Sequence, residues 1–280
     1  IPIHVEKSDK RDSFRKKYTK PTELRKASAK ELFESYKPKT TIEEKPEGIE
    51  KWLENIQFCL NKMSSKNYEN QKDEILKNLN KCIAFAADNE NDVCKKVIDA
   101  LFNFASINKF YVSVYAKLSK ELLEISDEFK ELIFEHLNTF INGIKDIQYV
   151  EPDDDYEQYC MNTKKKDIRK ALTLFIVQLM KEDIVPANKV LNIMVGFQKR
   201  ILEFIDLEEK TNEVDEISEI LYLFLKEGKD TFQQCKAEWI WKFMIKQNIE
   251  TISKYSKKEK KGLSTRSIFK YKDMVQLIGD

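Results

Sequence analysis

The residues of this 280-residue chain that could carry out covalent or metal chemistry are few and scattered. Its two histidines, His4 and His136, have no cysteine or carboxylate partners at metal-ligand spacing, and a lone histidine in a helix is seldom a general base. The five cysteines show no CxxC or CxH spacing, which argues against a zinc site or a disulfide framework. No glycine-rich phosphate loop or nucleophile elbow is present. The sequence therefore predicts a protein that is not an enzyme and uses no metal or cofactor.

Charge is distributed unevenly along the chain. Residues 1–46 hold 13 Lys/Arg against 8 Asp/Glu, residues 254–280 hold 8 against 3, and the middle holds 28 against 37. Basic ends around an acidic body indicate two surfaces with different partners, although the same charges could simply solvate helix faces. The acidic stretch Glu151–Asp155 is expected to be a solvated loop rather than a cation site.

A basic loop before the last expected helix is the clearest candidate for nucleic-acid contact. It contains five lysines with Tyr255 among them: Lys254, Lys257, Lys258, Lys260 and Lys261. Attraction to phosphates would give salt-dependent RNA binding without sequence preference. A solvated lysine loop is the alternative.

The elements that would position these residues are helices. Only 6 Gly and 6 Pro occur, fewer than a β-rich or loop-rich fold needs. At the centre, the spacing predicts two helices joined at residues 106–109; they carry Val97, Leu101, Phe104 and Ala105, and then Tyr111, Val114, Tyr115, Leu118 and Leu122. Neither helix can bury its apolar stripe alone, so further hairpins must pack on either side.

Apolar periodicity predicts similar helices throughout residues 48–280. They are expected at about 48–63, 68–88, 127–145, 156–181, 187–206, 214–226 (ending before Gly228), 230–254 and 264–278. Asn91 or Asp92 would cap the helix that carries Val97. About ten helices in five antiparallel pairs, with units of about 40 residues, are typical of an all-α HEAT-type solenoid. Residues 1–46, with four prolines and no sustained periodicity, are expected to form an extended arm, which gives domains of 1–46 and 47–280. No apolar run reaches membrane-spanning length and no signal peptide is visible, which favours a cytoplasmic protein.

Four stretches, in order, resemble the middle domain of eukaryotic translation initiation factor 4G. They are Cys59-Leu60-Asn61-Lys62-Met63-Ser64 followed by Tyr68; Val97-Ile98-Asp99 with Phe102, Ala105, Tyr111, Tyr115, Ala116 and Leu118; Phe175-Ile176-Val177-Gln178-Leu179 with Lys181; and Ser264-Thr265-Arg266 with Phe269, Asp273 and Leu277. The chain departs from the family where Met63 replaces a Leu, Tyr68 replaces a Phe and Ala171-Leu172 replaces a Gly-Asn pair.

The resemblance implies a crescent of five helical hairpins that binds the DEAD-box RNA helicase initiation factor 4A and holds its two lobes in a productive arrangement. One implied helicase contact consists of Leu60, Asn61, Lys62, Met63 and Tyr68, and the other of Arg266, Phe269 and Asp273. The apolar members fit helix stripes and could equally be core, and Arg266 and Asp273 could pair only to fix the last hairpin. Asn61 and Lys62, polar at a helix end, are the stronger candidates for surface contact.

The arm contains a second resemblance. The family binds the cap-binding initiation factor 4E through a Tyr-x-x-x-x-Leu-Φ segment, and Tyr18 and Leu24 stand at its first and last positions after a basic lead. Glu23 replaces the required Leu, so a plain flexible arm is the alternative.

Two other functions remain open from the sequence. One is a related middle domain from splicing, mRNA decay or ribosome assembly, which would bind a different DEAD-box helicase. The other is a protein-interaction solenoid without an RNA role. A functional Tyr18/Leu24 segment would distinguish initiation from the first, and salt-dependent RNA binding would exclude the second.

Overall fold

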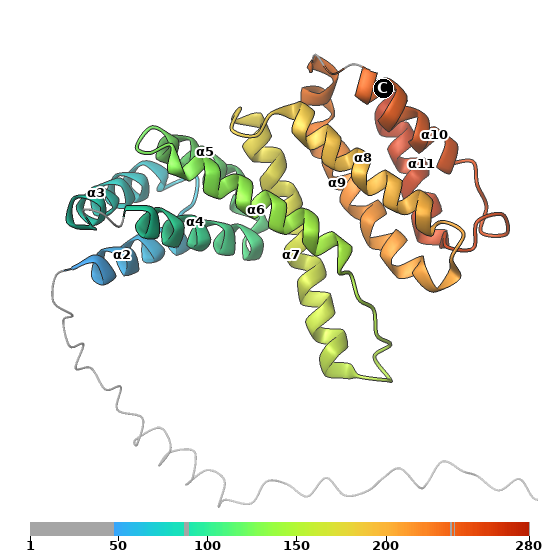
Figure 1. Ribbon diagram of the computed structural model, residues 1–280, viewed down its shortest axis with the longest axis horizontal. Helices are drawn as coiled ribbons and strands as arrows, with labels where there is room; N and C mark the ends of the chain where they lie inside the picture. Colours follow the sequence, from blue (N-terminus) through green and yellow to red (C-terminus); the bar gives the residue numbers. More distant parts are fainter. Residues whose placement is uncertain (1–47, 87–89, 236, 238, 280) are drawn as a thin grey trace, which may run out of the picture. The chain divides into compact units, whose positions relative to one another are not determined.

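The computed structural model describes residues 48–86, 90–235, 237 and 239–279, and within these residues the protein is helical without any β-strand (Figure 1). The α-helices are α2 (Ile49–Lys62), α3 (Tyr68–Ala86), α4 (Glu90–Ile107), α5 (Val112–Leu123), α6 (Glu128–Lys145), α7 (Tyr156–Lys181), α8 (Ala187–Phe204), α9 (Thr211–Gln234), α10 (Gln247–Ile252) and α11 (Thr265–Gly279). Short 3₁₀ turns precede α5 (η2, Lys109–Tyr111) and α9 (η3, Glu208–Lys210), and a π-helix (η4, Ile240–Lys246) leads into α10. The all-α prediction is confirmed. The expected arm lies outside the described residues.

Local sequence sets the helix ends. Asp155 caps α7, where its carboxylate accepts a hydrogen bond from the Gln158 amide at 2.9 Å. The break after α2 is fixed by Asn67, whose side-chain oxygen accepts from the Ser64 amide at 2.7 Å while its amide donates to the Lys62 carbonyl at 2.9 Å. Such side-chain bonds replace the backbone bonds that a helix end lacks.

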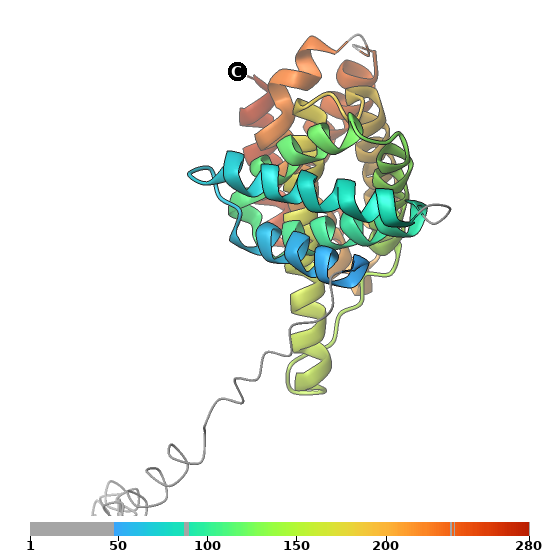
Figure 2. The same ribbon diagram turned by 90° about the vertical axis from the view of Figure 1, so that its left-hand side faces the viewer.

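Packing follows a regular order through this part of the chain. Helix α2 packs on α3 and on α4, and then α4 packs on α7, α7 on α9 and α9 on α11. Beside this row, α5 packs on α7, α6 packs on α4, and α8 packs on α9 and η4. Figure 1 shows α2 and α11 at opposite ends of the row, with α7 between them, and Figure 2 views the row from its α2 end. The buried apolar side chains form one continuous core along it.

Three helix predictions are corrected by the structure. Gly228 does not end a helix: it lies inside α9, where a Cβ would come within 2.8 Å of the Phe232 ring, so glycine serves close packing there. The expected helix 230–254 is divided: α9 ends at Gln234, a π-helix follows from Ile240, and Trp239 before it and Phe243 within it are both exposed. Asn91 and Asp92 lie within α4 rather than before it, since α4 begins at Glu90.

The two central helices and the break between them are confirmed with one change. Val97, Leu101 and Ala105 are buried and the chain breaks after Ile107, but Tyr111 is exposed in η2 instead of joining the stripe of α5. Among the described helices, none is long and apolar enough to cross a membrane.

Candidate functional site

The first predicted contact, at the end of α2, divides into buried and exposed residues. Leu60, Met63 and Tyr68 are 0%, 2% and 6% exposed, and Tyr115 Oη donates to the Leu60 carbonyl at 3.2 Å. These three side chains belong to the core, so they cannot touch a partner in this conformation. Asn61 and Lys62 are exposed at the helix end.

Beside Lys62, the structure reveals an exposed aromatic residue that sequence reasoning missed. The Lys62 ammonium lies 3.7 Å from the centre of the Phe58 ring, and Phe58 is 57% exposed. A cation over an aromatic face is attracted by the ring quadrupole. The spacing of four residues between Phe58 and Lys62 was the available signal, because it places both on one helix face.

These residues border a shallow groove between α2 and α3. Its volume is about 460 Å³, and the charged side chains along it are Lys51, Lys62, Glu74, Lys77 and Lys81. Four lysines against one glutamate give this end of the helical row a positive surface. It suits an acidic face of a partner.

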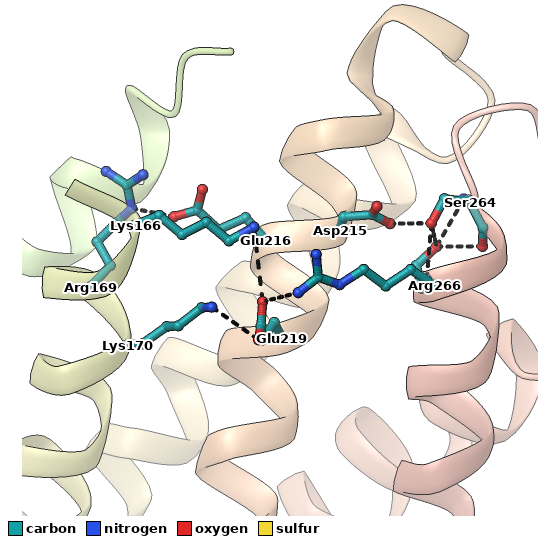
Figure 3. A network of polar contacts seen from close by, with 9 residues as sticks. Lys166, Arg169, Lys170, Asp215, Glu216, Glu219, Ser264 and Arg266 are labelled. Atoms are coloured by element: carbon teal, nitrogen blue, oxygen red, sulfur yellow. Dashed lines mark hydrogen bonds and ion pairs between the residues drawn. The ribbon is translucent and has the colours of Figure 1, made fainter. Parts of the chain in front are cut away.

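The second predicted contact lies beside a polar network that links α7, α9 and α11 (Figure 3). Glu219 of α9 accepts from Lys170 at 3.0 Å and from Arg266 Nη2 at 2.9 Å, and Lys166 Nζ lies 3.9 Å away. Three cations from two helices thus converge on one carboxylate, whose side chain is 20% exposed. Next to it, Arg169 Nε pairs with Glu216, which is buried.

The surroundings shift the pKa values of this network. Burial alone would raise the pKa of Glu219, but the hydrogen bond from Lys170 and the charges of Lys170, Arg266 and Lys166 outweigh it, so the pKa is lowered. The pKa of Lys166 is lowered as well, by burial and then by the nearby Arg266 charge. The network therefore favours an ionised Glu219 and holds more cations than this carboxylate alone can neutralise.

Arg266 and the start of α11 have a structural role. Ser264 Oγ donates to Asp215 at 2.6 Å and accepts from the Ser267 amide at 3.0 Å, which caps α11 and fixes it to α9 (Figure 3). Together with the Arg266–Glu219 pair, these bonds show that the Ser264-Thr265-Arg266 pattern joins α11 to α9.

Phe269 and Asp273 lie further along α11 and are open to solvent. Phe269 is 59% exposed, and Asp273 pairs with Lys270 at 3.8 Å. Phe269 is the member of this set with the most apolar surface available for a partner.

The basic loop joins α10 to α11 and is anchored at one lysine. Lys254, Lys257, Lys258 and Lys261 are exposed, whereas Lys260 pairs with Asp206 at 2.9 Å and its pKa is raised by that bond. The Gly262 amide also donates to the Ile205 carbonyl at 2.9 Å. Four of the five predicted lysines are therefore exposed on a loop that is held near its C-terminal end.

Tyr18 and Leu24, the expected contact for the cap-binding factor, lie outside the described residues. Within the described residues, no cluster of three or more His, Cys, Asp or Glu could hold a metal ion. A scan of the chain against protein-family models and a search of curated proteins both return no match.

Proposed function

We propose that this protein is a cytoplasmic translation-initiation scaffold that binds and positions a DEAD-box RNA helicase of the initiation factor 4A type. In this proposal, residues 47–280 form a HEAT-type solenoid of about five antiparallel hairpins. One helicase lobe binds at the exposed end of α2 and the other at α11. The basic loop between α10 and α11 contacts RNA, and the arm tethers the cap-binding initiation factor 4E through Tyr18 and Leu24.

The observation that carries the proposal is the separation of two exposed contact sets on one helical row. Asn61, Lys62 and Phe58 lie at one end, and Phe269 lies at the other, with α4, α7 and α9 packed between their helices. A scaffold without catalytic groups can change an ATPase rate only by binding one conformation of the enzyme better than others. Two contacts held apart on one folded unit provide such a preference for a two-lobed enzyme.

The experiment is the ATPase rate of initiation factor 4A with RNA, measured with and without the full chain, alongside equilibrium binding. We expect the chain to bind and to change the rate. The double variant Asn61→Ala/Lys62→Glu and the single variant Phe269→Ser should each weaken binding at least about tenfold, equivalent to about 1.4 kcal/mol. Both change exposed side chains, so circular dichroism should remain that of the wild type.

The control is Lys95→Glu, an exposed charge reversal on α4 outside both contact sets. Wild-type binding by both contact variants would refute the assigned surfaces. Failure of the folded chain to bind initiation factor 4A, with binding to a helicase from splicing, mRNA decay or ribosome assembly, would refute the initiation role. Unchanged binding of initiation factor 4E by Tyr18→Ala/Leu24→Ala would remove the arm from the proposal.

A further inference from the structure

A groove between α6 and α8 lies apart from the residues assigned above. Its volume is about 550 Å³, and its floor is apolar, formed by Ile141, Ile144, Ile193 and Phe197. The Phe140 and Phe197 rings, with centres 6.1 Å apart, join the two helices beneath it.

Gly196 keeps this groove open. It is exposed in the interior of α8, and no atom lies within 4 Å of the place that a Cβ would occupy. A glycine inside a helix costs about 1 kcal/mol relative to alanine. No contact within the described residues requires glycine here, in contrast to Gly228, where the Phe232 ring fills the space. The missing side chain instead leaves room for an external group.

The rim of the groove is basic. Lys145, Lys189, Lys199 and Arg200 surround it, and Glu203 is the one acidic residue of the lining. None of these four cations forms an ion pair with a carboxylate among the described residues: Lys145 donates to the Asn142 side chain and Lys189 covers the Phe134 ring. The cations of the α7–α9–α11 network, by comparison, have carboxylate partners.

The contacts of Arg200 show the same shortage of acceptors for its N–H groups. Its Nη2 donates to the Lys145 carbonyl at the end of α6 at 2.7 Å, and its guanidinium lies 4.8 Å from the centre of the Phe204 ring. Its Nε is shielded from solvent and has no hydrogen-bond partner. A buried N–H without an acceptor carries a desolvation cost, so the fold does not satisfy this guanidinium fully.

We infer that the α6–α8 groove is a docking site for an acidic amphipathic segment of a partner protein. Two or three apolar side chains at helical spacing enter the floor over Gly196, and carboxylates on either side meet Lys145, Lys199 and Arg200. This is the helix-in-groove mode of recognition, with charge complementarity setting specificity. Nucleic acid fits less well, because the isoleucine-rich floor offers no open aromatic face on which bases could stack.

The test uses a displayed library of random 16-residue peptides, selected on the full-length wild-type protein after depletion on Gly196→Phe. The phenylalanine would occupy the open space above the floor without meeting another atom at its Cβ. Gly143→Phe is the matched control: Gly143 also has no atom within 4 Å of its Cβ position, but it lines a different hollow beside His136. We expect enriched peptides to be acidic with apolar residues at i, i+3 or i+4, and i+7.

A synthetic peptide with an enriched sequence should bind the wild type and Gly143→Phe equally and Gly196→Phe at least tenfold more weakly. It should also shift the methyl NMR signals of Ile141, Ile144 and Ile193, which line the floor. The pair Lys145→Glu/Lys199→Glu provides a second loss-of-binding variant if Gly196→Phe does not fold.

Three results would overturn the inference. The first is no enrichment over the depleted pool, and the second is enriched peptides that are basic or lack the apolar spacing. The third is self-association of the wild type, seen by sedimentation and abolished in Gly196→Phe, because the occupant would then be a second copy of this chain. None of these results depends on helicase binding, so the inference can fail while the proposed function stands.

Discussion

Two glycines inside helices should respond with opposite signs to the same substitution. Gly196 of α8 and Gly228 of α9 both lie in helix interiors, where alanine is favoured by about 1 kcal/mol. At Gly196 the added methyl meets nothing within 4 Å. Gly196→Ala should therefore raise the free energy of unfolding by about 1 kcal/mol.

At Gly228 the same methyl meets packed atoms. Its Cβ would lie 2.8 and 3.0 Å from two ring carbons of Phe232 and 3.1 Å from the Met180 methyl. Phe232 is fully buried and its ring stacks near Trp241, with centres 5.9 Å apart, so the ring has little freedom to turn away. Overpacking of this kind costs about 1–3 kcal/mol. After the helix-propensity gain, Gly228→Ala should lose about 1 kcal/mol, which places the two variants about 2 kcal/mol apart.

The assay is urea unfolding followed by circular dichroism at equal protein concentration, with the change read from the midpoint at constant slope. Thermal melting should separate the two variants by roughly 4–8 °C. In a Phe232→Leu background the obstructing ring atoms are absent, and Gly228→Ala should become neutral or stabilising. A Gly228→Ala protein as stable as the wild type would refute the packing argument, and a destabilised Gly196→Ala would refute the open space above α8.

Two further predictions concern the contacts that hold the C-terminal helices. Glu219→Gln should lower stability at pH 7 by about 2 kcal/mol, because it leaves the partly buried Lys166 and Lys170 and the exposed Arg266 without this anion. Because the folded state lowers the pKa of Glu219, this stabilisation is present above the ordinary pKa near 4.5 and is lost as pH falls through the folded-state pKa. Urea titrations of the wild type and the variant should therefore converge in acid. A constant difference in stability down to about pH 3 would contradict this. Gly262→Ala should destabilise the loop before α11, because its Cβ would collide with the Phe204 carbonyl oxygen. Faster hydrogen exchange at the Leu263 amide would report the change, and exchange at the wild-type rate would contradict it.

The sequence predicted the long, strongly periodic helices well. Helix α7 has the bounds that the pattern indicated, because Asp155 is a strong N-cap and the apolar spacing continues to Leu179. The C-terminal third was predicted less well. Trp239 and Phe243 look like core residues in the sequence, yet both are exposed. Phe243 lies in a π-helix and Trp239 directly before it, and the wider turn of a π-helix moves side chains off the α-helical stripe.

The candidate site was only partly visible for similar reasons. A motif that ends an amphipathic helix necessarily includes core positions, so Leu60 and Met63 are buried while Asn61 and Lys62 face solvent. Glu219 was missed because one glutamate in a charged helix resembles a solvated residue; its importance depends on cations from α7 and α11, far away in sequence. Likewise, nothing local distinguishes the open space beside Gly196 from the filled space beside Gly228.

Three cations share the single Glu219 carboxylate, and this has a consequence for how the sequence can vary. Lys166, Lys170 and Arg266 all supply charge to the same carboxylate, so replacement of any one of them leaves two to neutralise it. The acidic position has no such substitute, because its loss leaves all three cations facing one another. Among related proteins we therefore expect the three basic positions to drift individually, provided at least two persist, while the acid between them stays fixed.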